Sequence, residues 1–240
     1  MSLYAIGDLH LSFQSDKSME VFGEEWKNHS YKIKRNWCSI VKETDTVVVT
    51  GDHSWGKKLP DSMNDLEFIA ALPGRKILLR GNHDRFWNKT NKTEKLNELF
   101  ADKLFFLQDN FYEYTDEKSG KKYAIIGSKG FSTDNYCFLA EDKIESRFKN
   151  ERKRLAKSYE AAKEAGYNDF IMFLHYPPTN MYEEEGVFTK LAQEFKVEQV
   201  VYSHLHGKGR FDYSITGRKE GIKYTLVSSD YLDFMPKLIK

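Results

Sequence analysis

Short apolar runs that end abruptly in aspartate or histidine constrain the fold of this chain more than any other feature. The clearest run, residues 76–80, has the length and composition of a buried strand and is followed at once by Gly-Asn-His-Asp at residues 81–84. Polar side chains at such a place are costly to bury without partners. The same succession recurs after residues 2–7, 45–50, 169–174 and 197–202. Because strand ends of parallel α/β sheets converge at one edge, the repetition predicts a shared site there.

Segments with helical spacing of apolar residues separate these runs, which indicates the α/β class. Helices are expected at residues 32–42, 60–72, around 96–100, 141–165 and 183–195. Three more strands are expected at residues 104–107, 111–114 and 122–127, the last two as a hairpin. A second hairpin is expected to pair residues 210–216 with 223–227. No linker or internal repeat is evident in the sequence, which predicts a single domain over residues 1–240.

The totals fit a soluble globular protein, with 240 residues, 40% hydrophobic and 30% charged. A formal net charge of +1 gives no global argument for binding nucleic acid or a membrane. No signal peptide is visible at the N-terminus, and no apolar run reaches membrane-spanning length. The two cysteines, Cys38 and Cys137, lack metal-type spacing and fit a reducing compartment, so a cytoplasmic location is expected.

Histidines gather at the ends of the expected strands. Five of the seven lie there, namely His10, His83, His175, His204 and His206. Histidines, two aspartates and an asparagine brought together are electrostatically costly unless they hold cations. Nitrogen and oxygen donors without thiolates suit manganese, iron or zinc better than calcium or magnesium. A metal site is therefore expected.

The order of these motifs resembles the calcineurin-like metallophosphoesterase family. The resemblance is carried by Asp8-x-His10, Gly51-Asp52, Gly81-Asn82-His83-Asp84, His175 and His204-x-His206, from residue 8 to residue 206. Asp-Leu-His-Leu-Ser at residues 8–12 and Ser-Trp at residues 54–55 are also similar to a bacterial subgroup of uncharacterised phosphohydrolases. The resemblance implies a four-layer αββα sandwich, two mixed β-sheets flanked by helices.

The resemblance also implies roles for single residues. One metal ion would be held by Asp8, His10, Asp52 and His206, and a second by Asn82, His175, His204 and the bridging Asp52. The cofactors would be two divalent or trivalent ions of manganese, iron or zinc. A hydroxide bridging them would attack the phosphorus, and His83 would protonate the leaving alcohol as general acid, without a covalent enzyme intermediate.

Four positions depart from the family pattern. Trp55 stands where many members carry an Asp or Asn that orients the acid histidine, and Asp84 is expected to take over that task as a second catalytic residue. Gly56 stands where the protein phosphatases carry a phosphate-binding arginine, which disfavours a phosphoprotein substrate. Ser203 replaces the usual glycine before His204, a tolerable change. For His53, which directly follows Asp52, a role in its loop is favoured over metal ligation.

The expected substrate is a small phosphodiester or a nucleotide-like phosphoester, although the choice between monoester and diester stays open. The candidate substrate-binding residues are Trp55, Arg80, Phe86 and Tyr176. The aromatic residues among them, together with Trp87, lie next to the motif residues, where a nucleotide base could stack on them. One alternative is a catalytically silent scaffold that binds proteins, disfavoured because every expected ligand and His83 are present. A nuclease is another, but balanced charge does not favour a nucleic-acid partner. No membrane partner is expected, and the sequence does not predict an oligomeric state.

Overall fold

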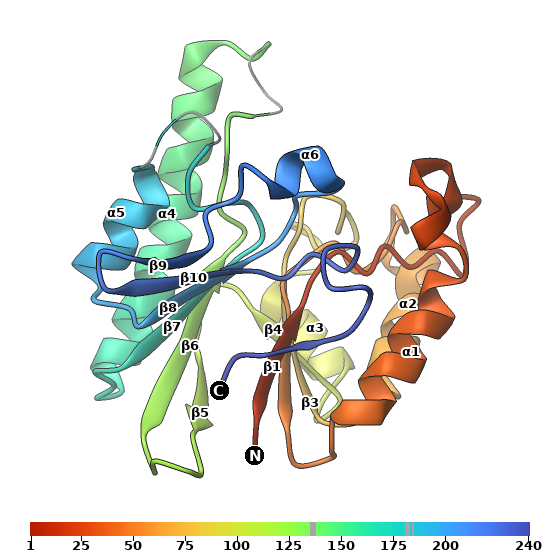
Figure 1. The fold of residues 1–240 in the computed structure, drawn as a ribbon, viewed down its shortest axis with the longest axis horizontal. Coiled ribbons are helices and arrows are strands. Elements are labelled where there is room, and N and C mark those ends of the chain that lie inside the picture. The colour runs from red at the N-terminus through yellow and green to blue at the C-terminus, as the bar shows by residue number, and fades with distance from the viewer. Residues whose placement is uncertain (135–137, 181–182, 184) are drawn as a thin grey trace.

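The computed structural model describes residues 1–134, 138–180, 183 and 185–240, and shows two β-sheets packed face to face between outer helices (Figure 1). Sheet 1 has five strands in the order β11-β1-β2-β3-β4. Their bounds are Lys237–Leu238 (β11), Leu3–Ile6 (β1), Thr46–Val49 (β2), Arg75–Leu79 (β3) and Leu104–Leu107 (β4). The strands β1 to β4 are parallel, and β11 pairs antiparallel with β1 at one edge.

Sheet 2 has six strands in the order β5-β6-β7-β8-β10-β9. Their bounds are Tyr112–Thr115 (β5), Lys122–Ser128 (β6), Phe170–Leu174 (β7), Gln199–Tyr202 (β8), Ile222–Leu226 (β10) and Gly217–Lys219 (β9). The four central strands are parallel, and the edge strands β5 and β9 pair antiparallel. Both sheets are therefore mixed, and the expected four-layer fold class is confirmed.

Helices cover the outer face of each sheet (Figure 1). Sheet 1 packs against α1 (His29–Ile40), α2 (Leu59–Ala70) and α3 (Thr93–Leu99). Sheet 2 packs against α4 (Glu141–Glu164) and α5 (Val187–Glu194). Three short turns of helix complete the fold, η1 (Met19–Phe22), η2 (Glu24–Trp26) and α6 (Lys208–Phe211). No described helix combines the length and the apolar character needed to cross a membrane.

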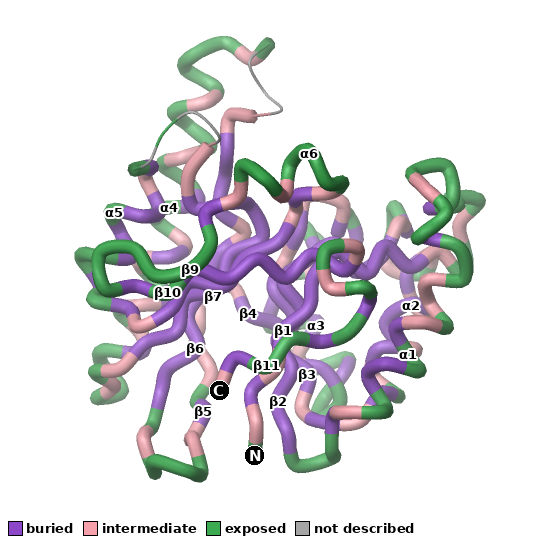
Figure 2. Tube along the Cα trace, viewed as in Figure 1, coloured by how far each residue is buried: buried purple, intermediate pink, exposed green. Residues whose placement is uncertain are grey.

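The strands read as continuous apolar runs because both of their faces are buried. In β7, Ile171 and Phe173 face the layer between the sheets, whereas Phe170, Met172 and Leu174 face α4 and α5. The tube in Figure 2 shows buried backbone concentrated in the strands and exposed backbone in the outer loops and helix faces. This packing fixes both sheets, so the loops at their strand ends start from rigid positions.

The last quarter of the chain differs from the expected pairing. The hairpin expected between residues 210–216 and 223–227 is wrong in its first arm, because residues 208–211 form α6 and β10 pairs with β9 instead. Glu220 and Gly221 make the tight turn between β9 and β10, both with positive φ. The two-residue strand β11 was not expected, since a segment so short carries no periodicity.

Candidate metal centre

The polar residues that follow five strands lie together at one edge of the two sheets. Sheet 1 contributes the loops after β1, β2 and β3, and sheet 2 contributes the loops after β7 and β8. Two groups of potential metal ligands form there, Asp8, His10 and His206 in one and Asp52, His175 and His204 in the other. Within each group, one ligand atom per residue lies within 4.8 Å of the others. The first group holds three residues of the first expected set and the second group three of the second, with Asp52 in the second group.

Four of the ligand residues have backbone in the left-handed region, which non-glycine residues seldom adopt. The φ angles are 57° for Asp8, 44° for His10, 53° for Asp52 and 74° for His204. Asp8 and His10 therefore lie in a turn and not in an extended segment. The strand ends at Ile6, and a strained turn brings the two side chains to the same site. Such strain is typical of functional sites.

In the first group, the ring nitrogens converge on the carboxylates. His10 Nε2 lies 3.3 Å from His206 Nε2 and 3.8 Å from Asp52 Oδ2. His206 Nε2 lies 3.9 Å from Asp8 Oδ1. Asp52 Oδ2 is also 3.5 Å from His175 Nε2 in the second group. Asp52 thus stands between the two groups.

In the second group, two hydrogen-bond acceptors face each other. His175 Nδ1 lies 3.0 Å from the carbonyl oxygen of Thr50 and donates its proton there, which leaves a lone pair on Nε2. That nitrogen lies 2.7 Å from Asn82 Oδ1 and 3.1 Å from His204 Nδ1. Two acceptors at such a separation repel unless both bind the same cation, so this donor set fits a metal ion.

Protonation equilibria in the site also fit cations. Burial raises the pKa of Asp8 to about 6, and burial together with Asp84 and Asp8 raises the pKa of Asp52. Burial lowers the pKa values of His10 and His175, and that of His204 to about 3, so these rings are neutral and keep lone pairs. Asp8 Oδ1 is buried and has no hydrogen-bond partner among the described residues. A positive ion would satisfy both carboxylates and these rings.

Asp230 orients His206 and was not expected from the sequence. Its Oδ1 lies 3.0 Å from His206 Nδ1, and its Oδ2 accepts a hydrogen bond from the backbone N–H of Gly207. Burial opposes a charge on His206, but the contacts with Asp230 and Asp8 raise its pKa above the usual value. Because Asp230 follows β10 closely, the rule of an apolar strand followed by aspartate could have found it. Carboxylates in this position fix the tautomer and direction of metal-binding histidines.

His83 lies at the mouth of the site with its ring 35% exposed, and its Nε2 is 4.0 Å from Asp52 Oδ2. Trp55 packs against it at 4.3 Å between ring centroids and stacks on His10 at 4.9 Å. Lys17 Nζ lies 4.2 Å from the centroid of the same indole ring. Burial lowers the pKa of His83 to about 4. In this chain the ring of Trp55 therefore holds His83 by packing, where many members use a carboxylate or an amide.

Asp84 does not orient the His83 ring, contrary to the expectation from the sequence. Its buried carboxylate accepts hydrogen bonds from the backbone N–H groups of Asp52, His53 and Gly81, and lies 2.9 Å from His53 Nδ1. Burial opposes its ionisation, but these contacts lower the pKa of Asp84 below its usual value. Asp84 and His53 thus join the loops after β2 and β3, which agrees with the loop role favoured for His53.

The four candidate substrate-binding residues have different surroundings. Trp55 lines a cavity of about 410 Å³ that opens onto the ligands. Phe86 is buried in the core between sheet 1 and its helices, so its assignment to substrate contact is wrong. Tyr176 is only 1% exposed and packs on His204 at 4.2 Å between ring centroids, which makes it a support for a ligand residue. Arg80 is half-buried at the end of β3.

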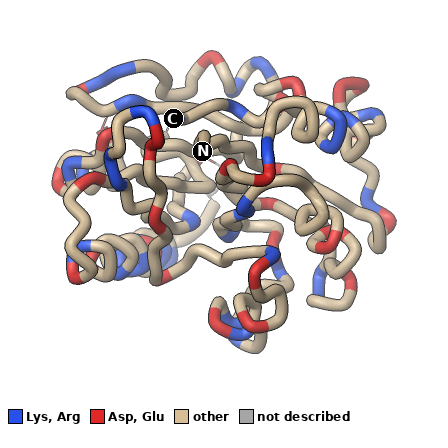
Figure 3. The backbone as a smooth tube through the Cα atoms, turned by 90° about the horizontal axis from the view of Figure 1, so that it is seen from below, with Lys and Arg blue, Asp and Glu red and all other residues tan. Residues whose placement is uncertain are grey.

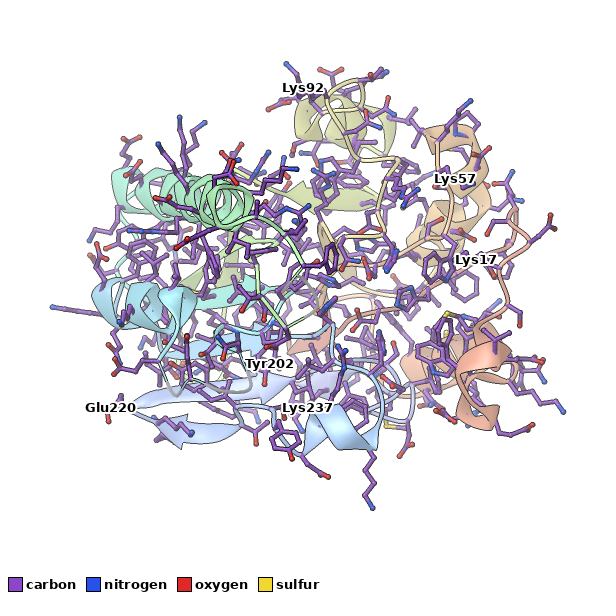
Figure 4. The ribbon with its side chains drawn as sticks, turned by 90° about the horizontal axis from the view of Figure 1, so that it is seen from above. Lys17, Lys57, Lys92, Tyr202, Glu220 and Lys237 are labelled. Atoms are coloured by element: carbon purple, nitrogen blue, oxygen red, sulfur yellow. The ribbon has the colours of Figure 1, made fainter. Side chains whose placement is uncertain are left out.

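The sequence missed most of the cavity wall. Besides Trp55, the wall is formed by Trp26, Met19 and Phe22 from the segment after β1, with Glu25, Arg210 and Asp230 at polar positions. Figure 4 looks down on this edge of the sheets, with the N-terminal segment that carries Lys17 on one side and α4 on the other. The sequence signal for Trp26 was weak because an aromatic residue in a loop is as often part of the core as of a site.

The profile of the calcineurin-like phosphoesterase family matches residues 1–208. The chain belongs to the calcineurin-like phosphoesterase family. This family consists of metal-dependent phosphoesterases, and the donor groups described above are candidates for the metal site. A curated relative, the Gene 66 protein of Mycobacterium phage L5, is 32% identical over 77 residues, 32% of this chain and 37% of the relative. The chain thus matches little more than a third of the length of that relative.

Two solved structures share the fold at low sequence identity. The phosphopantetheinyl hydrolase PptH of Mycobacterium tuberculosis has a TM-score of 0.61 and 14% identity, with 99% of this chain and 95% of PptH covered. The protein of unknown function AQ665 of Aquifex aeolicus has a TM-score of 0.51 and 17% identity, with the same coverage. At these identities the similarity concerns the fold alone.

Proposed function

We propose that this protein hydrolyses a small phosphoester with the help of two metal ions held at the paired donor groups. The observation that carries the proposal is Asp52, whose Oδ2 lies within 4.0 Å of ring nitrogens from both groups and of His83 Nε2. Manganese, iron and zinc are the ions that suit these nitrogen and oxygen donors. When bound, two such metal ions supply a hydroxide nucleophile and stabilise charge on the phosphate.

The residues of the chain would provide orientation and a proton. Asp230 directs His206, and the carbonyl oxygen of Thr50 directs His175, so that each ring presents a lone pair to the site. His83 faces the cavity and would protonate the leaving oxygen, a step that is worth roughly 10²–10⁴-fold in rate. Binding of a phosphate dianion beside His83 would raise its pKa from the low value in the free protein.

The cavity supports a small substrate rather than a polymer. Its volume of about 410 Å³ is that of a site for a small organic molecule, and its wall is mostly apolar. The acidic residues Glu25 and Asp230 lie in the same wall. Basic and acidic residues are interspersed along the backbone (Figure 3), whereas a polynucleotide groove is normally basic. A small phosphodiester or nucleotide-like phosphoester therefore fits better than nucleic acid.

The test is hydrolysis of bis-p-nitrophenyl and p-nitrophenyl phosphate by chelator-stripped protein refilled with manganese, iron or zinc. We expect metal-dependent turnover that the chelator abolishes. Because p-nitrophenolate leaves with little help from an acid, His83→Ala is tested with an alkyl phosphoester, whose turnover it should strongly reduce. Preference for the monoester would overturn the diester part of the proposal and leave the metal centre intact. Stoichiometric metal binding without turnover of either ester would contradict the proposed activity and favour a catalytically silent scaffold.

A further inference from the structure

Two half-buried cations beside the metal centre have unused hydrogen-bonding capacity. Within the described parts of the chain, neither the guanidinium of Arg80 nor the ammonium of Lys129 donates a hydrogen bond, and Arg80 Nε is buried. Lys129 Nζ forms an ion pair of 3.8 Å with Glu151 Oε1. Cations removed from water normally find hydrogen-bond acceptors. These two groups lack protein acceptors, and the accessible part of the Lys129 side chain, 23%, leaves a ligand access to it.

The two cations belong to a charged group that we call the basic cluster, formed by Arg80, Lys129, Arg154, Glu151 and Asp109. Arg154 lies 3.7 Å from Glu151 and 3.5 Å from Asp109, and Arg80 interacts electrostatically with Glu151, Arg154 and Lys129. Three cations and two carboxylates leave a net charge of +1, and the ion pairs around Glu151 are longer than hydrogen bonds. Glu151 Oε2 is buried without a partner among the described residues. The cluster is therefore loosely paired and attracts an anion.

The basic cluster adjoins the second donor group. Lys129 Nζ lies 5.4 Å from the ring centroid of Tyr176, and that ring packs on His204 at 4.2 Å. The backbone oxygen of Lys129 accepts a hydrogen bond from the N–H of His175. One aromatic ring thus separates the ammonium from a candidate metal ligand.

The basic cluster and the cavity lie on different sides of the metal centre. The cluster comes from the ends of β3, β4 and β6 and from α4, whereas most of the cavity wall comes from the segments after β1, β2, β8 and β10, with His83 from the loop after β3. Figures 1 and 4 show α4 and the N-terminal segment at opposite sides of the molecule. A molecule bound at the metal centre could therefore contact both.

We propose that the basic cluster binds a second anionic group of the substrate, a phosphate that is not cleaved. This inference rests on the proposed function and narrows its substrate class to small molecules with two phosphate groups. Lys129 and Arg80 would donate the hydrogen bonds, which are strong when both partners are charged. Glu151, the buried carboxylate among these cations, weakens the attraction for an anion.

The first test measures binding without catalysis. The full-length chain is kept free of metal with a chelator, so that metal ions do not hold the anion, and is titrated with pyrophosphate by calorimetry. We expect Lys129→Met and Arg80→Met each to weaken binding at least tenfold, and Glu151→Gln to strengthen it at least threefold. The matched control is Arg152→Met, an exposed position on the same helix, with unchanged binding. Lys129→Arg, which keeps the charge, should bind within threefold of the wild type and so separates lost charge from misfolding.

The second test compares substrates of the metal-loaded enzyme. For Lys129→Met we expect the KM for adenosine 3′,5′-bisphosphate to rise at least tenfold and that for adenosine 5′-monophosphate to change less than twofold. Equal effects on both, or pyrophosphate binding that no variant weakens, would overturn the proposal. If pyrophosphate binds at the cluster but the KM values of both substrates change equally, the cluster binds a free anion and not the substrate. That result also overturns the proposal. If the wild type cleaves neither these compounds nor the p-nitrophenyl esters, the proposed function fails, whereas the calorimetry still decides whether the cluster binds anions.

Discussion

His83 differs from the other histidines at the strand ends because its ring belongs to neither donor group. If it protonates the leaving oxygen, its importance depends on how poor the leaving group is. We expect His83→Asn to lower kcat by ~10²–10⁴-fold for an alkyl phosphoester and by much less for a p-nitrophenyl ester, whose leaving group needs little protonation. Steady-state kinetics with both substrates checks this. Equal losses on the two esters would mean that His83 acts in binding only.

Asp230 contacts the ring of His206, so we expect its substitution to change the metal affinity more than any other property of the protein. Its carboxylate lies 3.0 Å from His206 Nδ1 and is 4% exposed. We expect Asp230→Asn to weaken metal binding by ~10–100-fold, since such partners set the direction and basicity of a ligand ring. Metal titration followed by calorimetry is the measurement. Asp233→Asn, an exposed carboxylate three residues later, is the matched control and should leave the metal affinity unchanged.

At the scale of elements, the loops after β2 and β3 are packed so closely that only glycine fits between them. A Cβ on Gly81 would lie 2.1 Å from Asp52 Oδ1 and 2.2 Å from the Asp52 backbone nitrogen. We expect Gly81→Ala to displace Asp52, to reduce the metal content per chain and to destabilise the fold by ~1–3 kcal/mol. Gly209→Ala, where a Cβ meets nothing within 4 Å, is the control. Full metal content in Gly81→Ala would show that the loops can move apart.

The elements also show how far sequence reasoning reaches. The strands before Asp8, Asp52, Asn82 and His175 could be predicted because both of their faces are buried, so each one appears as an unbroken apolar run. The direction of a loop side chain could not be predicted. Phe86 and Trp55 both adjoin motifs, but Phe86 points into the core and Trp55 lines the cavity, and tertiary packing alone makes that difference. The wrong hairpin arm at residues 210–216 has a related cause. Residues 217–219, and not residues 210–216, pair with β10, and the local sequence pattern does not reveal that choice.

At the scale of the whole molecule, the metal centre joins the two sheets. Asp8, His10, Asp52 and Asn82 come from loops of sheet 1, whereas His175, His204 and His206 come from sheet 2. The sheets contact each other through the apolar layer between them, and the polar contacts at this edge add a second connection. Because the candidate ligands come from both sheets, the site depends on both sheets being folded.

A third connection lies far along the chain from the ligands, around Glu198. Its carboxylate accepts hydrogen bonds from Tyr123, Lys121 and the side chain of Lys240, which follows β11 of sheet 1. Burial opposes its ionisation, but the contacts with Lys240 and Tyr123 lower the pKa of Glu198 to about 2. A pKa below the unfolded value of about 4.3 stabilises the fold above that pH, and this stabilisation is lost as the pH falls towards 2.

We therefore expect Glu198→Gln to lower the free energy of unfolding at pH 7 and to have a vanishing effect near pH 2. Glu198 is 38% exposed, so solvent screens its ion pairs and the loss at pH 7 should be only ~0.5–1 kcal/mol. Urea unfolding of the wild type and the variant at pH 7, 4 and 3 measures the difference. Glu194→Gln, at an exposed position of α5, is the control. A difference that stays constant from pH 7 to pH 3 would mean that packing, and not the charge of Glu198, connects the two sheets here.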